Sequence, residues 1–160
     1  VMLTLGLAGC GGSSSSSSSA SAGGTPPAHV HFAKTKFVLH AGLAFGAFHR
    51  YIYKPFRSGG FTPVGSHKLA IVKAGVAALF VYHEVKIALL DAQSSPVLSK
   101  LVSPLTALQT RMRGLEARLH GGQLDSSAIN GASSDVSSLG SMASQAGAPV
   151  RDLATSALGG

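Results

Sequence analysis

Histidine is the residue in this sequence best suited to metal or proton chemistry, and two of the seven histidines fall on stretches with helical spacing. His83 shares a helical stripe with the apolar residues Leu79 and Ile87 and is followed by Glu84. His40 flanks the apolar face of an earlier stretch. If these stretches are antiparallel helices, both imidazoles would project into one interior and could bind a transition metal or haem iron. The competing interpretation is a core histidine hydrogen-bonded to a carbonyl or tyrosine, with no cofactor, and this is our main expectation.

No catalytic motif accompanies these histidines. The pair His83-Glu84 is half of the zinc-protease pattern H-E-x-x-H, but Ile87 stands where the second histidine would be. The sequence contains no G-x-S-x-G elbow and no glycine-rich phosphate loop after a strand. Only six acids occur among 160 residues, so carboxylate chemistry has few candidates. We therefore expect a protein that is not an enzyme.

The single cysteine, Cys10, lies near the start of the sequence, so no intramolecular disulfide can form. It closes the run Leu7-Ala8-Gly9-Cys10, which resembles the lipobox of bacterial lipoproteins. That resemblance implies that the thiol of Cys10 takes a diacylglycerol, that cleavage precedes Cys10, and that the protein is exported and held on the outer face of the cell membrane. We expect residues 1–9 to be a truncated signal peptide, because a basic segment should precede them.

A Ser- and Gly-rich stretch follows the lipobox. Residues 11–24 are almost wholly Gly, Ser and Ala, and Pro26 and Pro27 lie close behind. Such composition is typical of a flexible linker with an r.m.s. span of roughly 25 Å. We expect a linker over residues 10–31 and a helical domain over residues 32–160.

A basic-aromatic segment, FGAFHRYIYKPFR, occupies residues 45–57. Its cations follow one another at intervals of four and three, which aligns them along one side of a helix that continues through Pro55. The predicted membrane- or partner-binding residues are Arg50, Tyr51, Lys54, Phe56 and Arg57. The competing interpretation is a helix end that buries its rings and solvates its charges.

The net charge of +7 is concentrated beside the linker. Residues 29–90 contain eight Lys or Arg against the one acid Glu84, whereas residues 121–160 contain one Arg against three Asp. A basic surface attracts anionic lipid, polymer or nucleic acid, and export disfavours nucleic acid. We therefore expect the acylated N-terminus to bind the bilayer and the domain to contact anionic lipid, wall polymer or an envelope protein.

Apolar periodicity predicts about four helices and no strands. A helix over residues 32–56 has one apolar stripe: Phe37, Ala41, Phe45, Phe48 and Ile52. Residues 66–92 have two stripes: Leu69, Val72, Val76, Leu79, Phe80, Ile87 and Leu90 on one side, and Ile71, Ala78, Val85 and Leu89 on the other. Two stripes favour a central helix, and Gly42 and Gly46 against Ala70, Ala74 and Ala78 suggest that these two helices approach closely.

A third helix follows Ser95-Pro96, an expected N-cap and first-turn proline. Its heptad seam is Leu98, Leu101, Leu105, Leu108, Met112, Leu115 and Leu119. Pro104 should kink it or split off its first turn, and Gly121-Gly122 should end it. A fourth helix repeats the spacing with Ile129, Ala132, Val136, Leu139, Ala143 and Ala146, and a short last helix is expected over residues 150–158.

The expected fold is thus all-α, an antiparallel bundle of about four helices plus a short C-terminal helix after a disordered tether. The expected function is that of an envelope lipoprotein with a non-enzymatic interaction or scaffold domain. The alternative is a small-ligand binder that holds a metal or haem through His40 and His83. A further alternative, helices that span the membrane, is disfavoured because mid-helix charges cost roughly 2.5 to 3.5 kcal/mol each on insertion.

Overall fold

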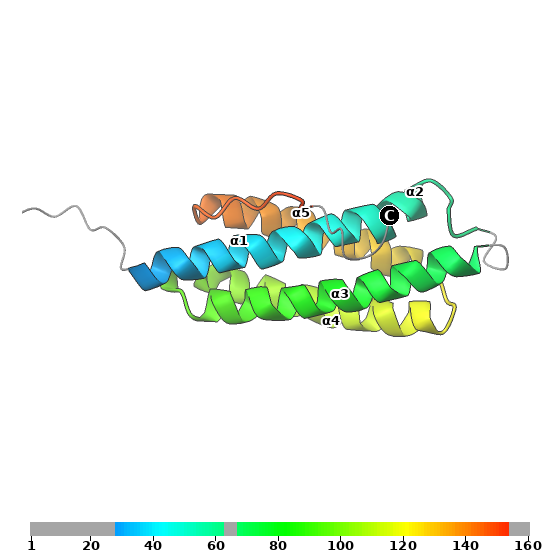
Figure 1. The fold of residues 1–160 in the computed structure, drawn as a ribbon, viewed down its shortest axis with the longest axis horizontal. Helices are drawn as coiled ribbons and strands as arrows, with labels where there is room; N and C mark the ends of the chain where they lie inside the picture. The colour runs from blue at the N-terminus through cyan, green and yellow to red at the C-terminus, as the bar shows by residue number, and fades with distance from the viewer. Residues whose placement is uncertain (1–27, 63–66, 154–160) are drawn as a thin grey trace, which may run out of the picture.

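The computed structural model describes residues 28–62 and 67–153, and within them the chain is all-α (Figure 1). Cys10 and most of the predicted linker lie outside this part. The longer elements are α1 (Ala28–Phe48), α3 (Lys68–Gln93), α4 (Val102–His120) and α5 (Ser126–Gln145). Shorter ones are a π-helical turn (His49–Tyr53), α2 (Lys54–Arg57) and a 3-10 helix (Pro96–Leu101). Helix α1 takes in residues 28–31, which composition assigns to the linker, because they contain no helix breaker.

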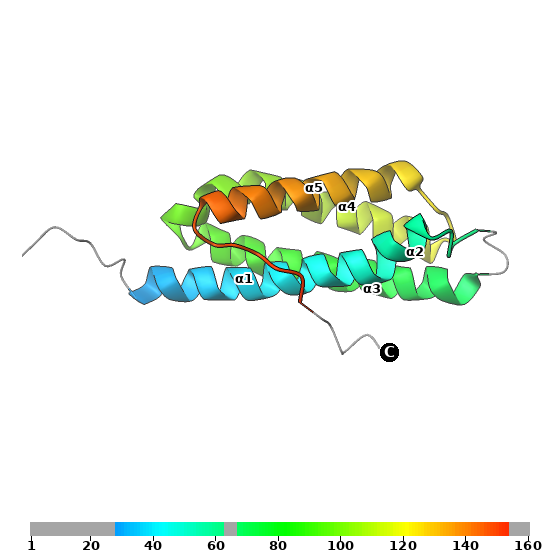
Figure 2. The ribbon, with the colours of Figure 1, turned by 90° about the horizontal axis from the view of Figure 1, so that it is seen from above.

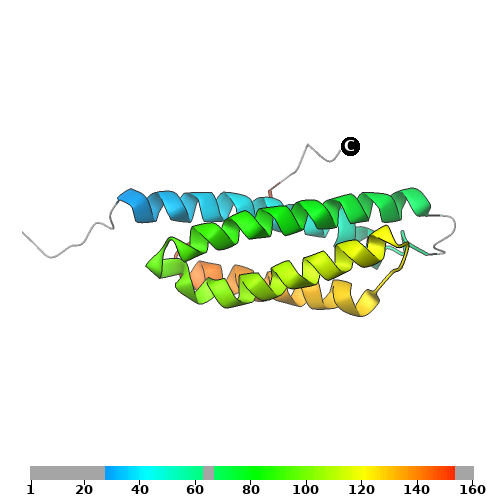
Figure 3. The same cartoon turned by 90° about the horizontal axis from the view of Figure 1, so that it is seen from below.

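The long helices form an antiparallel bundle, which confirms the expected fold class. Helix α3 packs against both α1 and α4, and α5 folds back along α4. Figure 2 shows α1 and α3 on one side of the bundle and α4 and α5 on the other, and Figure 3 shows α3 running beside α4. Within the described residues, no helix combines the length and the apolar character needed to cross a membrane.

The predicted seams of three helices form the core. All five stripe residues of the first predicted helix are buried, four in α1 and Ile52 in the π-helical turn, as are all seven seam residues of the segment from Leu98 to Leu119. The fourth seam is buried from Ile129 to Ala143. These seams pack as predicted because leucine and phenylalanine at heptad spacing leave a helix only one face that can be desolvated.

Helix α4 ends before Gly121-Gly122 as predicted, but it begins at Val102 rather than directly after Ser95-Pro96. A 3-10 turn precedes Pro104, so the first turn is split off as expected. At the other end Gly122 adopts a φ of 73°, and the Gln123 N–H donates to the Arg118 carbonyl at 2.8 Å. Ser95 does occupy the N-cap position of the 3-10 helix, but its side chain makes no capping hydrogen bond.

Helix α3 buries the smaller of its two apolar faces. The stripe with Ile71, Ala78 and Val85 is buried together with further alanines, whereas Leu69, Val72, Val76, Leu79 and Leu90 are exposed. The two stripes predicted a central helix, and this is confirmed because α3 packs against both α1 and α4, although most of the bulkier stripe is exposed. Alanine faces allow α3 to approach α1 and α4 closely, and this close packing leaves the bulky stripe on the outside.

The last predicted helix is wrong over the residues that the structure describes. Residues 150–153 are extended, and residues 154–158 of the prediction lie outside the described part. After α5, the chain turns at Gly147, whose φ is 69°, and returns across α1 (Figure 2). We call residues 148–153 the C-terminal strap.

Candidate functional site

The basic-aromatic segment forms the end of the α1 side of the bundle, and its helix passes through Pro55. A proline inside a helix lacks an N–H, and its ring collides with the carbonyl four residues earlier. Here a π-helical turn precedes the proline, and the Lys54 N–H donates to the carbonyl of His49, five residues back. The wider turn accommodates Pro55, so the helix continues to Arg57. The alignment of Arg50, Lys54 and Arg57 along one side depended on a helix that continues through Pro55. The sequence did not reveal the π turn itself.

The five predicted binding residues divide into exposed cations and half-buried rings. Arg50, Lys54 and Arg57 are exposed, and none of them forms an ion pair with another described residue. The Arg50 guanidinium lies over the Tyr51 ring, 5.6 Å from its centroid. Tyr51 and Phe56 are partly buried against the core. The rings therefore anchor this end of the helix while the cations face solvent, as the competing interpretation of the segment predicts. Contact of these residues with a membrane or a partner stays a prediction.

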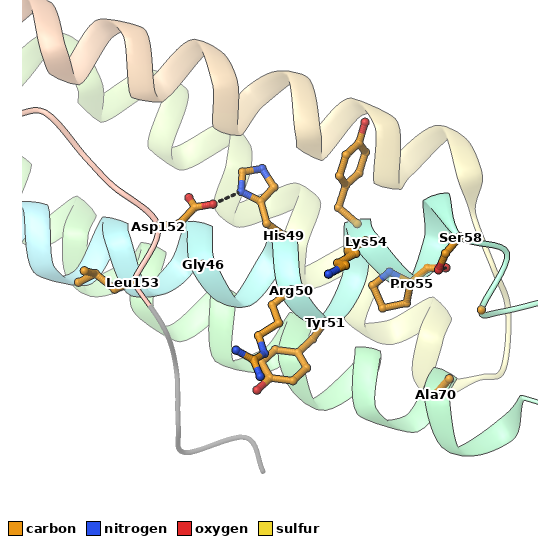
Figure 4. Close-up of a pocket in the computed structure, with 12 residues that line it drawn as sticks. Gly46, His49, Arg50, Tyr51, Lys54, Pro55, Ser58, Ala70, Asp152 and Leu153 are labelled. Atoms are coloured by element: carbon orange, nitrogen blue, oxygen red, sulfur yellow. Dashed lines mark hydrogen bonds and ion pairs between the residues drawn. The ribbon is translucent and has the colours of Figure 1, made fainter. Parts of the chain in front are cut away.

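An open hollow of about 950 Å³ lies along this end of the helix (Figure 4). Arg50, Tyr51 and Lys54 line it, together with Ala70 from α3 and Asp152 from the strap. In Figure 4 the Arg50 and Tyr51 side chains point the same way, and His49 points toward Asp152 on the other side of the helix. The two cations that line the hollow, Arg50 and Lys54, have aromatic rings beside them. Such a surface is complementary to an anionic group on a larger molecule.

The strap closes one border of this hollow. His49 Nδ1 lies 2.6 Å from Asp152 Oδ2, and the Leu153 N–H donates to the Gly42 carbonyl at 3.0 Å. A Cβ at Gly42 would meet the Arg151 carbonyl at 2.7 Å, and one at Gly46 would meet the Leu153 carbonyl at 2.0 Å.

The absence of a side chain at Gly42 and at Gly46 therefore leaves room for the strap. The expectation that these two glycines face α3 is wrong. The small-residue spacing was evident from the sequence, but its partner is the strap rather than the neighbouring helix. Asp152 and Leu153, which border the hollow, were missed because an extended strap has no periodicity to detect.

The hollow does not contain an assembled nucleophile. His49 has its carboxylate partner, as the base of a catalytic triad would. The hydroxyl of Ser58, however, donates to the Pro55 carbonyl at 3.1 Å. Within the described residues no hydrogen bond joins Ser58 to His49.

The histidines of the ligand-binding alternative do not meet. His40 Nδ1 lies 2.7 Å from Glu84 Oε2, and Glu84 is buried at the interface of α1 and α3. His83 is exposed, so the expectation that it shares an interior with His40 is wrong. Helical geometry explains this, because adjacent positions are about 100° apart and Glu84 takes the inward place.

No group of three or more His, Cys, Asp or Glu positioned to hold a metal occurs in the described part of the chain. Near the His40–Glu84 pair, burial raises the pKa of Asp91, against the lowering effect of His40 and Lys36. Asp91 Oδ2 is buried without a hydrogen-bond partner in the described structure. These groups form a structural cluster between α1 and α3 rather than a ligand set.

Comparison with known proteins finds no counterpart: no family model matches the sequence, and neither a curated protein nor a solved structure is similar to it.

Proposed function

We propose that this protein is a cell-envelope lipoprotein whose helical domain is a non-enzymatic interaction module, held to the membrane through Cys10. The proposal for the anchor rests on the resemblance of Leu7-Ala8-Gly9-Cys10 to a lipobox. The proposal for the domain rests on the basic-aromatic end, where Arg50, Lys54 and Arg57 are exposed without acidic partners among the described residues. An anionic membrane, a wall polymer or an acidic protein partner would each supply the complementary charge.

The exposed cations are the observation that carries this proposal. Surface cations are commonly neutralised by nearby acids, as Arg111 is by Asp135 at 2.6 Å on the α4–α5 side. At the basic-aromatic end the one acid among the residues lining the hollow, Asp152, pairs with His49 instead. The three cations are therefore available to a partner. The metal or haem alternative has no comparable support, since His83 is exposed and His40 is held by Glu84.

Charge reversal at this end tests the proposal. The full chain with Cys10→Ser, which removes the acylation site, is compared with the same chain carrying Arg50→Glu, Lys54→Glu and Arg57→Glu. The probes are phosphatidylcholine vesicles containing phosphatidylglycerol and a purified phosphate-rich wall polymer, both at low salt. Each near-surface cation contributes about 1 kcal/mol, so we expect roughly hundredfold weaker binding to at least one probe. Binding by the parent chain should fade toward 1 M salt.

A matched control separates a local surface from net charge. Lys36→Glu, Lys100→Glu and Arg113→Glu change the net charge by the same amount at exposed positions away from this end. We expect this variant to lose much less affinity than the first, with thermal stability nearly unchanged in both. Equal losses in the two variants would mean that the overall charge binds the probe. Unaltered binding in the first variant would refute a role for the basic-aromatic end.

A further inference from the structure

Helix α3 carries an unpartnered apolar stripe along its outer side. We call this the outer stripe: Leu69, Val72, Val76, Leu79 and Leu90. Each of these side chains is more than half exposed, and Leu69 reaches 70%. Single exposed apolar residues are ordinary, but several on one side of a helix, at intervals of three and four from Leu69 to Leu79 and again at Leu90, mark an interaction surface.

The outer stripe lies on the side of α3 opposite the core. On a helical wheel its members centre about half a turn from Ala74, Ala78 and Val85, which are buried. From Leu69 to Leu90 the stripe extends about 32 Å at 1.5 Å per residue. Helix α3 runs along the bundle beside α4 (Figure 3), so the stripe follows the long direction of the molecule and could lie flat on a surface.

Most of the charges around the outer stripe are basic, although Glu116 of α4 lines a groove with Val72, Val76 and Leu79. Lys68, Lys73 and Lys86 are exposed beside it, and none of them forms an ion pair within the described residues. His83 lies in line with the stripe. Of the two acids of α3, Glu84 contacts His40, and Asp91, which lies at the same helical angle as Lys73, interacts electrostatically with His40 and Lys36.

An apolar stripe bordered by lysines is the pattern of a helix that lies in the interface of an anionic bilayer. We infer that the outer stripe of α3 docks on an anionic lipid surface, with the helix parallel to the membrane plane. The apolar side chains enter the boundary between head groups and acyl chains, and the lysines contact lipid phosphates. This surface is separate from the basic-aromatic end, and the inference does not depend on acylation of Cys10.

The charge distribution favours lipid over a second copy of the chain. Two outer stripes placed face to face would bring Lys68, Lys73 and Lys86 of both copies together, and Glu116 of α4 is the one acid among the residues that line the groove beside the stripe. Like charges across an interface are destabilising. An anionic head-group layer instead supplies complementary charge along the whole stripe, about 32 Å in length.

Tryptophan substitution tests the inference directly, because the chain contains no Trp and each new indole is the sole reporter. Full-length chains with Cys10→Ser carry Leu79→Trp, Leu90→Trp or, as a control, Ser138→Trp at an exposed position of α5. Figures 1 and 2 show α5 on the far side of the bundle from α3. Phosphatidylcholine vesicles with and without phosphatidylglycerol are the probes.

With anionic vesicles we expect blue-shifted emission from the Leu79→Trp and Leu90→Trp chains, with quenching by brominated acyl chains that places both indoles at similar depth. The Ser138→Trp chain should show neither effect. A similar shift in all three chains would overturn the assignment to α3. Clearly different depths for the two α3 indoles would overturn the parallel orientation. A shift that appears without vesicles and grows with protein concentration would indicate a second copy on the stripe, and no shift under any condition would overturn docking.

A charge variant separates this inference from the proposed function. Lys68→Gln, Lys73→Gln and Lys86→Gln in the Leu79→Trp chain should weaken vesicle binding, measured by the emission shift, about fivefold for each lysine lost. The Arg50, Lys54 and Arg57 charge reversal in the same chain should leave the depth of the indole unchanged at saturating vesicle concentration. If the lysine variant binds as well as its parent, anionic lipid is not the occupant. If the emission shift persists but charge reversal at Arg50, Lys54 and Arg57 leaves probe binding unaltered, the proposed function is refuted and the inference about the outer stripe stands.

Discussion

Glu84 is the one charged side chain that is buried in the described part of the bundle, and His40 is its hydrogen-bonding partner. A buried carboxylate needs a donor, since an unpaired polar group in a packed interior costs more than a hydrogen bond returns. His40 therefore joins α1 to α3 through a polar contact rather than through a cofactor. The sequence placed His40 beside the correct helix but paired it with the residue next to Glu84.

Removal of the His40 imidazole should show how far the stability of the bundle depends on the His40–Glu84 hydrogen bond. We expect His40→Ala to lower the free energy of unfolding by about 1 to 3 kcal/mol, because the Glu84 carboxylate loses its partner while it remains buried. The matched control, His83→Ala, removes an exposed side chain and should change stability by no more than about 0.5 kcal/mol. Urea denaturation followed by circular dichroism measures both. Equal effects would contradict the pairing.

The exposure of three of the five predicted binding residues could be predicted from the sequence, whereas the burial of the other two could not be decided from it. The exposure of Arg50, Lys54 and Arg57 follows from spacing and charge alone. Burial of the rings was the competing interpretation of the same segment. The extent to which Tyr51 and Phe56 are buried against the core depends on tertiary packing. His49 could not be recognised as bordering the site, because its partner Asp152 lies 103 positions away.

At the scale of elements, alanine explains most of the difference between the expected and the observed packing. Large side chains at heptad spacing identify the core faces of α1 and α4 unambiguously, and both were predicted correctly. In α3 the two faces compete, and hydrophobicity alone favours the bulkier one. The structure instead buries the alanine face, because close helix approach gains many contacts that no single-residue scale counts.

The strap depends on the absence of a side chain at Gly46, where a Cβ would lie 2.0 Å from the Leu153 carbonyl. We expect Gly46→Ala to release the strap from α1 and to break the His49–Asp152 contact, while the bundle stays folded. Amide hydrogen exchange at Leu153, whose N–H donates to Gly42, reports the release directly.

The control for this substitution is Gly114→Ala. No atom lies within 4 Å of the Cβ added at this exposed helical position. The same chemical change there should stabilise the protein by about 0.5 to 1 kcal/mol, because alanine favours the helix, and should leave exchange at Leu153 unaltered. Unchanged protection of Leu153 in Gly46→Ala would show that the strap does not need this glycine.

Across the whole molecule, acids and bases are arranged unevenly. On the α4–α5 side, Arg111 pairs with Asp135 and Arg118 with Asp125, whereas Arg113 forms no ion pair among the described residues. On α1 through α3, histidines take the acid contacts, and the Lys and Arg side chains remain solvated. Net charge and its distribution were evident from the sequence. Which cations lack partners was not, because that depends on how the helices are aligned.

The proposed anchor makes a prediction for the whole protein in its host. We expect Cys10→Ser to abolish lipid labelling and to move the protein from the membrane fraction to the soluble fraction after a high-salt wash, since acylation provides the stable attachment. Ser13→Ala, within the serine run, should leave labelling and fractionation unaltered. Retention of the cysteine variant in washed membranes would contradict acylation as the anchor.

The strap also bears on the order in which the chain folds. Most of the other helix contacts join neighbours in the sequence, α1 with α3, α3 with α4 and α4 with α5, so they close short loops and form early, while α5 also contacts the π-helical turn at His49–Tyr53. The His49–Asp152 contact closes a loop of 103 positions and needs α1 in place before the strap can cross it. The rate of bundle formation should therefore be insensitive to the strap, which joins the first helix to the last segment as the closing step of folding.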